Sequence, residues 1–268
     1  MSPSLQRLQA VELEIFKELQ RVCEKHSLRY YLLAGSALGA VRHQGFIPWD
    51  DDIDVGLPRP DYEQFSDYCR TELDERFFWQ TYHTEPSYTA IFGKLRMNGT
   101  RYIEQATARL PIHHGIKIDV FPLDGIPRNA RARALHRMAL RACMVKIGSR
   151  LERSQRTTFR DRIARLIPRR MAIALCEKMT VRYPFDDSEI VVNMGGAWGY
   201  ERESAARSWF AGGETLPFED VRARVPKLWH EYLTHMYGDY MRLPPEDQRV
   251  NDRHPVSSID FAADDEAE

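Results

Sequence analysis

The chain begins with apolar residues spaced three and four positions apart. Within residues 4–26 this set comprises Leu5, Leu8, Val11, Ile15, Leu19 and Val22. Such spacing places the side chains along one side of a helix, so an amphipathic helix that serves packing is predicted. The same criterion predicts a helix from Pro60, a residue that suits a first helical turn, and another over residues 226–240.

Strands are predicted where apolar residues cluster or alternate with polar ones. The segments are 32–34, 52–55, 77–82, 91–97 and 116–121, with shorter strands and glycine turns in 190–225. Asn98-Gly99 is a two-residue hairpin signal, which predicts that residues 100–104 pair with the strand before it. Two long helices, broken near Pro168, are predicted within residues 128–182.

Four aspartates stand within five positions. They are Asp50, Asp51, Asp52 and Asp54. Carboxylates this close repel one another, and a bound cation removes that cost. Alternation in Asp52-Ile53-Asp54-Val55 places both carboxylates on one face of a strand, where they offer hard oxygen ligands to Mg²⁺ or Mn²⁺. A solvated loop is the alternative for such a run, and the sequence leaves open whether Asp50 and Asp51 touch a metal.

A further carboxylate, Asp119, lies in the apolar alternating segment 116–121. Burying it without a partner would be costly, so it is expected to join Asp52 and Asp54 at the cation. Its alternative role is to cap the end of a strand.

The predicted strand 32–34 ends at Gly35-Ser36, and a helix is expected from about residue 37. Backbone N–H groups at such a strand-to-helix turn point outward and suit a phosphate. Gly-Ser alone is also an ordinary turn signal.

These segments resemble the LicD family of cholinephosphotransferases, to which fukutin-related proteins are distantly similar. The motifs are LAGSALGAVRHQGFIPWDDDIDVGLPR, IFGKLR, GIKIDVFPLDGIP at 115–127 and YGDYMRLPPEDQR at 237–249. The resemblance implies an α+β fold with a nucleotidyltransferase-like mixed β-sheet core flanked by helices. It implies one domain over residues 1–256, with a basic helical hairpin over 128–182 as an insertion.

By this resemblance the chain would be a metal-dependent transferase that moves a substituted phosphoryl group. Phosphocholine from CDP-choline is the favoured group, and the acceptor would be a hydroxyl of a cell-surface glycan or a lipid-linked glycan precursor, as in lipopolysaccharide or teichoic acid. The implied catalytic residues and metal ligands are Asp52, Asp54 and Asp119, and the implied substrate contacts are Gly35, Ser36, Arg42 and Lys94. Relatives that move other alcohol phosphates, such as ribitol phosphate, leave the head group open.

Two other functions remain open. One is a nucleotidyltransferase that passes NMP from an NTP to a small alcohol or sugar with the same carboxylates. The other is a non-enzymatic module that binds Ca²⁺ and docks on a membrane surface. An EF-hand is excluded, because Val55 stands where that loop needs glycine and Pro58 and Pro60 interrupt it.

The composition fits a globular chain, since 43% of the 268 residues are hydrophobic. No run of about 18 apolar residues is present, and the charged N-terminus does not resemble a signal peptide, so a cytoplasmic location is predicted. The four cysteines lack CxxC spacing, which predicts buried thiols and no zinc site. The acidic tail over residues 257–268 is expected to be disordered.

The net charge of −1 conceals a strong asymmetry. Residues 128–182 contain 16 Lys and Arg against 3 Asp and Glu. This excess predicts an anionic partner, either the inner face of the plasma membrane or a lipid-linked pyrophosphate glycan. Nucleic acid is not expected, since no recognised binding motif occurs. Trp198 and Trp209 are candidates for an aromatic pocket around a quaternary ammonium, with core packing as the alternative.

Overall fold

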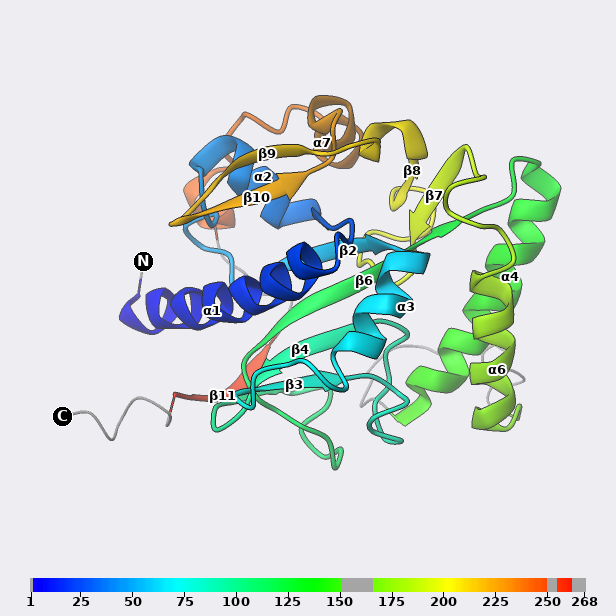
Figure 1. Cartoon of the computed structure of the whole chain (residues 1–268), viewed down its shortest axis with the longest axis horizontal. Coiled ribbons are helices and arrows are strands. Elements are labelled where there is room, and N and C mark those ends of the chain that lie inside the picture. The colour runs from blue at the N-terminus through cyan, green and yellow to red at the C-terminus, as the bar shows by residue number, and fades with distance from the viewer. Residues whose placement is uncertain (1, 151–165, 250–254, 262–268) are drawn as a thin grey trace.

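A computed structural model describes residues 2–150, 166–249 and 255–261. Its centre is a seven-stranded mixed sheet (Figure 1). The sheet runs β1 (Tyr31–Leu32), β2 (Asp54–Pro58), β6 (Lys117–Gly125), β4 (Gly93–Met97) and β3 (Phe77–Gln80), and β7 (Ile190–Asn193) and β8 (Ser204–Ala206) extend it from the end of β6. Only β2 and β6 pair in parallel among these described strands, so the sheet is mixed as expected.

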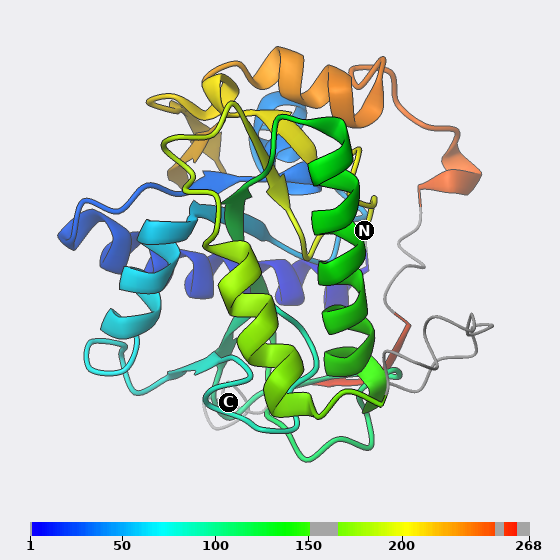
Figure 2. The ribbon, with the colours of Figure 1, turned by 90° about the vertical axis from the view of Figure 1, so that its right-hand side faces the viewer.

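Six α-helices lie around the sheet in the described part of the chain. They are α1 (Pro3–Lys25), α2 (Ala34–His43), α3 (Arg59–Tyr68), α4 (Ala130–Ile147), α6 (Arg169–Thr180) and α7 (Trp229–Tyr237). Short 3₁₀ turns occur at Gly148–Arg150, Arg207–Phe210 and Glu246–Gln248. Helices α4 and α6 stand side by side along one flank of the molecule (Figures 1 and 2). The α+β class is thus confirmed, and the break predicted near Pro168 is the start of α6.

Strand β6 lies at the centre of the core, because all nine of its residues are buried. The apolar stripe of α1 is confirmed, since Ile15, Leu19 and Val22 are fully buried against the sheet. A smaller apolar cluster joins α4 and α6 to β7. Helix α3 is tied to β6 by a buried ion pair in which Arg59 Nε and Nη2 donate to the two carboxylate oxygens of Asp124 at 2.7 and 2.8 Å.

The prediction that residues 100–104 pair with the strand before them, β4, is wrong. The chain does turn at Asn98-Gly99, where Gly99 has a positive φ of 77°. Strand β4, however, pairs with β3 on one edge and β6 on the other. Strand β5 (Arg101–Glu104) therefore leaves the central sheet and pairs with β11 (Val256–Asp260). Strands β9 (Glu214–Phe218) and β10 (Val221–Val225) form a separate hairpin.

Two sequence predictions need correction at element ends. Helix α2 begins at Ala34, so Gly35-Ser36 lies inside its first turn and not before it. The tail predicted to be disordered from residue 257 supplies most of β11, because its backbone finds hydrogen-bonding partners along β5. Residues 262–268 of that tail, and residues 151–165 of the predicted basic hairpin, lie outside the described residues.

All four cysteines are buried free thiols, as predicted. None of the helices in the described ranges is both long and apolar enough to cross a bilayer. The single domain, the insertion and the cytoplasmic location remain predictions.

Candidate active site

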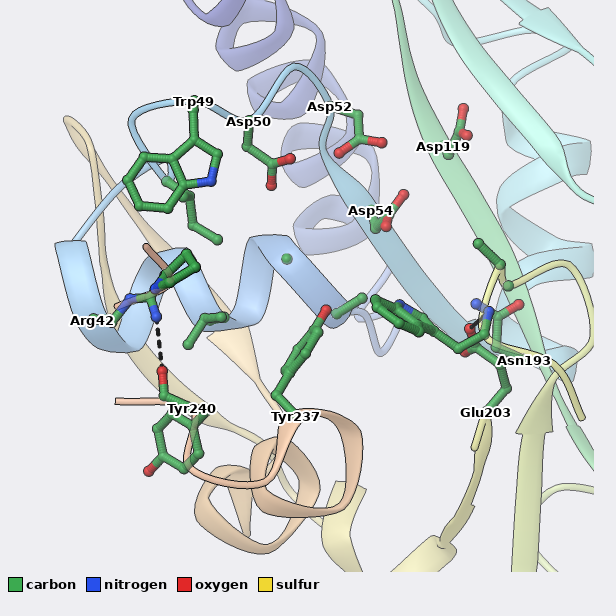
Figure 3. Close-up of a pocket in the computed structure, with 18 of the residues that line it drawn as sticks. Arg42, Trp49, Asp50, Asp52, Asp54, Asp119, Asn193, Glu203, Tyr237 and Tyr240 are labelled. Atoms are coloured by element: carbon green, nitrogen blue, oxygen red, sulfur yellow. Dashed lines mark hydrogen bonds between the residues drawn. The ribbon is translucent and has the colours of Figure 1, made fainter. Parts of the chain in front are cut away.

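A cleft of about 840 Å³ opens beside the aspartates Asp54 of β2 and Asp119 of β6 (Figure 3). Its walls come from segments far apart in the sequence, namely α2, the loop before β2, β6, the loop after β7, and the stretch after α7. Figure 3 shows Arg42 and Trp49 at one end, Glu203 and Asn193 at the other, and aspartate side chains between them. The cleft thus has a cationic end at Arg42, an anionic middle formed by aspartates, and an opposite end at Glu203 and Asn193.

The anionic middle rests on the parallel pairing of two strands. Asp54 and Asp119 occupy partner positions on β2 and β6, and the N–H of Asp119 donates to the carbonyl of Ile53 at 2.9 Å. Both carboxyl groups line the cleft, as does that of Asp52. Burial, and then the nearby Asp52 and Asp119, raise the pKa of Asp54 well above its usual range. The sequence prediction that these three aspartates gather in one place is consistent with this cleft.

Two lysines balance Asp119 from behind the cleft. Lys94 Nζ lies 3.4 Å and Lys117 Nζ 3.3 Å from Asp119 Oδ1. Lys94 also donates to Glu104 Oε1 at 3.1 Å. Burial alone would lower the pKa of Lys117, but Asp119, then Asp52 and Glu104, raise it well above its usual value. Lys117 is therefore a buried ammonium group whose charge is needed by its acidic neighbours.

Asp50, Asp51 and Asp52 bring their oxygens within 4.8 Å of one another, and in the described ranges no other acidic, histidine or cysteine trio does so. These half-buried carboxylates suit a hard divalent cation. Their loop is fastened to the fold, because Gln9 Nε2 donates to the Asp50 carbonyl at 2.8 Å and Tyr102 Oη to Asp51 Oδ2 at 3.0 Å. The trio differs from the predicted ligands Asp52, Asp54 and Asp119, with which it shares only Asp52.

Helix α1, predicted to serve packing alone, contributes to this region. Besides Gln9, it buries Glu12, and Glu12 Oε2 has no hydrogen-bond partner among the described residues. Burial raises the pKa of Glu12 well above its usual value, while Lys117 acts to lower it and Asp52 to raise it. A buried polar strip therefore extends from α1 to the carboxylates of the cleft.

Gly35 and Ser36 support the carboxylates in different ways. Gly35 lines the cleft, and a Cβ atom there would lie 2.6 Å from Asp50 Oδ2. Only a glycine leaves room for that carboxylate. Ser36 is buried, and its Oγ accepts a hydrogen bond from the N–H of Asp54 at 2.8 Å. Ser36 therefore positions the start of β2 and, like Lys94, does not line the cleft.

The cationic end contains Arg42, Arg242 and Arg249. Arg42 Nη1 donates to the carbonyl of Tyr240 at 2.8 Å, which joins α2 to the segment after α7. Burial lowers the pKa of Arg42, and the nearby Arg249 acts in the same direction. The guanidinium of Arg249 lies over the Trp49 ring, 5.6 Å from its centroid. Cationic groups bind phosphate, and an aromatic ring offers a surface on which a base can stack.

The end of the cleft at Glu203 is built by the loop after β7. Trp198 and Tyr237 pack edge to face with ring centroids 5.8 Å apart, and both line the cleft beside Glu203. Glu203 Oε1 accepts from the N–H of Trp198 at 3.1 Å, and Gly196 lets the carboxylate approach the loop backbone closely. Burial raises the pKa of Glu203 to about 7, against the lowering effects of the Trp198 N–H and Arg202. Trp209 packs on the core and does not line the cleft.

Of the seven predicted site residues, five line the cleft: Asp52, Asp54, Asp119, Gly35 and Arg42. The residues that sequence reasoning missed are Trp49, Asn193, Glu203, Tyr237, Arg242 and Arg249. The motif at 237–249 was a signal for the arginines and Tyr237, although it indicated no role for them. Asn193 and Glu203 carry no local signal, because Asn193 is the last residue of the short strand β7 and Glu203 is one of several charged residues just before β8.

Comparison with known proteins identifies relatives of this chain. Residues 27–127 match the sequence model described as LicD/FKTN/FKRP, nucleotidyltransferase domain. The chain is 27% identical to the lipopolysaccharide cholinephosphotransferase LicD of Haemophilus influenzae over 92% of its length and 94% of that protein. It is 41% identical to the human ribitol 5-phosphate transferase FKRP, over 22% of this chain and 13% of that one. The resemblance to the LicD family is confirmed.

Proposed function

We propose that the chain is a metal-dependent transferase of substituted phosphoryl groups, because residues 27–127 match the LicD/FKTN/FKRP nucleotidyltransferase domain. It would move phosphocholine from CDP-choline to a hydroxyl of a glycan or of a lipid-linked glycan precursor. The observation that carries this proposal is the cleft in which the paired carboxylates of Asp54 and Asp119 lie between a cationic and an aromatic end. A nucleotide-activated donor has its groups in the same order, with the nucleotide at one end, the phosphoryl group in the middle and the head group at the other end.

The nucleotide half of the donor fits the cationic end. Arg42, Arg242 and Arg249 would bind the CMP phosphate, and Trp49 offers a ring on which cytosine can stack. Ala34 and Gly35, in the first turn of α2, also line the cleft. A helix N-terminus suits the second phosphate.

The proposal requires Mg²⁺ or Mn²⁺ held by Asp52, Asp54 and Asp119, which when bound neutralises charge on the transferred phosphoryl group. Asp50 and Asp51 lie close enough to Asp52 to add further oxygen ligands. The raised pKa of Asp54 supports this assignment, because carboxylates crowded at cost in the free protein gain from a cation.

The choline end of the donor fits the end of the cleft at Glu203. Trp198 and Tyr237 present aromatic rings, and Glu203 is a carboxylate beside them. A quaternary ammonium is attracted by ring faces and by a negative charge, and about 1–2 kcal/mol is expected from each desolvated ring contact. Arg202 stacks on Trp198 at 4.1 Å without lining the cleft, so this aromatic pair already accommodates one cation.

In the proposed reaction the acceptor hydroxyl attacks the phosphorus that bears choline. A new P–O bond to the acceptor forms as the bond to CMP breaks, and a cleft carboxylate takes the hydroxyl proton. Lys94 and Lys117 hold Asp119 in position. Positioning and charge neutralisation are the main requirements of such a transfer.

A second candidate is a true nucleotidyltransferase, favoured by the description of the matched domain itself. It would use the same carboxylates, but NMP would pass to the acceptor and pyrophosphate would leave. Product analysis separates the two reactions.

The test is a phosphorus-NMR assay of the purified protein with CDP-choline, Mg²⁺ and an extract of lipid-linked glycans. CMP release that requires Mg²⁺ and is lost in Asp52→Ala and Asp119→Ala would support the transferase. Asp67→Asn is the matched control, since Asp67 is exposed on α3 and does not line the cleft. Consumption of another CDP-alcohol would correct only the head group, and conversion of NTP to pyrophosphate would establish the alternative.

A further inference from the structure

The outer surfaces of α4 and α6 carry large apolar side chains in solvent. The exposed fractions are 65% for Leu135, 54% for Met138, 57% for Met171, 42% for Leu175 and 47% for Val181. On α4 the exposed residues are at 130, 131, 134, 135, 137, 138 and 141, and on α6 they are at 170, 171, 174, 175 and 178. This helical spacing gives each helix one continuous solvent face.

These faces are not a core left open by poor packing. The opposite sides of the two helices are already filled, with Leu140, Cys143 and Ile147 of α4 packed against Ala172 and Cys176 of α6. The two helices lie next to each other at the outside of the molecule (Figure 2). We name their exposed side the α4/α6 outer face. None of its residues lines the cleft.

Cations alternate with the apolar residues on the α4/α6 outer face. Arg131, Arg170 and Lys178 are exposed, and no described residue pairs with their charged groups. The described parts of 128–182 contain 11 Lys and Arg, and Glu177 is the only acidic residue in them. Glu177, which lies 2.9 Å from His83, is thus one carboxylate against eleven cations. A partner must therefore accept both positive charge and apolar side chains.

We propose that the α4/α6 outer face docks on an anionic lipid surface, with both helices lying in the interfacial plane. Arg131, Arg170 and Lys178 would contact lipid phosphates, while Met138 and Leu175 would enter the acyl boundary. Nucleic acid would satisfy the charges but leave the apolar side chains in water. An acidic protein surface would rarely match two parallel rows of Leu and Met. This inference does not depend on the reaction in the cleft.

The test is co-sedimentation of the full chain with vesicles of phosphatidylcholine alone and with one-third phosphatidylglycerol. Binding is expected only to the anionic vesicles and should weaken with salt. The triple variant Arg131→Gln, Arg170→Gln and Lys178→Gln should bind about 100-fold more weakly, at roughly fivefold per charge lost. The variant Met138→Ser and Leu175→Ser should lose at least about tenfold.

Matched controls exclude a general effect of surface substitution. Met241→Ser removes an apolar side chain that is 56% exposed elsewhere, and Arg101→Gln removes an exposed cation elsewhere. Both should bind like the parent chain. Hydrogen exchange provides a second readout, since vesicles should protect α4 and α6 more than the β9–β10 hairpin. Equal binding by all variants, equal loss in the controls, or binding to duplex DNA in preference to vesicles would each overturn the proposal.

Discussion

Asp54 and Asp119 stand side by side on the only parallel strand pair in the described sheet. Their backbone positions are fixed by the β2–β6 register, so the two Cα atoms cannot move apart without breaking backbone hydrogen bonds. Their surroundings differ, because Lys94 and Lys117 contact Asp119, whereas the neighbours of Asp54 include Asp52. The same substitution should therefore have opposite effects on stability at the two positions.

Asp54→Asn should abolish activity and stabilise the metal-free fold. The change removes a half-buried charge that other carboxylates repel, so the free energy of unfolding should rise by about 1 kcal/mol and Tm by about 2–4 °C. Turnover should fall by at least about 10³-fold, because a ligand to the cation is lost. Differential scanning fluorimetry in EDTA and the CMP-release assay measure the two effects.

Asp119→Asn is the matched comparison. It leaves the buried Lys117 without its nearest carboxylate, so the unfolding free energy should drop by about 3 kcal/mol. Mg²⁺ should raise the Tm of the parent chain but not that of either variant. If both variants lost stability equally, the charge balance described for β6 would be wrong.

Gly35→Ala should impair the site and spare the fold. The new methyl group would displace only the end of the Asp50 side chain, and alanine suits the interior of α2. We expect an unfolding free energy within about 0.5 kcal/mol of the parent value and a loss of about tenfold in Mn²⁺ affinity. Chemical denaturation and titration calorimetry test these values.

Gly39→Ala in the same helix provides the control. Its Cβ atom would lie 2.4 Å from the backbone oxygen of Gly45, which cannot rotate away. A stability loss of about 1–3 kcal/mol is expected, from overpacking. Equal losses in the two alanine variants would contradict the view that Asp50 alone occupies the space at Gly35.

Glu203 should make stability and donor binding depend on pH in opposite directions. The pKa of Glu203 is raised from 4.5 to about 7 in the fold, so its effect on stability is absent below about pH 4.5. As pH rises from there to 7, the folded state keeps a proton that the unfolded chain loses, and up to about 3 kcal/mol of stability is lost. Glu203→Gln should remove this loss, as denaturation at pH 5 and pH 8 would show.

Donor binding should improve over the same pH range, because a choline cation favours the ionised carboxylate. The KM for CDP-choline of the parent chain should therefore rise as pH falls below 7, whereas Glu203→Gln should show a high, flat KM. Burial raises the pKa of Tyr232, which lies near Glu203, so Tyr232 keeps its proton across this range. If the KM of the parent chain did not change with pH, Glu203 would have no role in binding the head group.

The ion pair between Arg59 and Asp124 should be important for stability and unimportant for chemistry. Asp124→Asn leaves a buried guanidinium without its counter-charge, and a loss of about 3–5 kcal/mol is expected in urea denaturation. The double variant Arg59→Met and Asp124→Leu should recover much of that loss. Activity per folded molecule should stay near the parent value, because neither residue lines the cleft.

Local patterns predicted the elements but not all of their partners. Apolar spacing identified α1, and strict alternation identified the strand that carries Asp119, because both depend on neighbours in the sequence. The pairing of β4 was mispredicted, since which edge of a strand is free depends on the whole sheet. Glu203 was not identified, because its properties arise from burial beside Trp198 and Arg202.

The cleft is closed by hydrogen bonds between distant parts of the chain. The N–H of Ala34 donates to the Tyr232 hydroxyl, and Arg42 donates to the carbonyl of Tyr240, each across 198 positions. Contacts of such separation form late and slowly in folding. On the ribosome, the aspartates would emerge long before the wall that encloses them, so a chain whose synthesis stops near residue 200 would display the carboxylates in open solvent. Catalytic competence should therefore arise only when translation is almost complete.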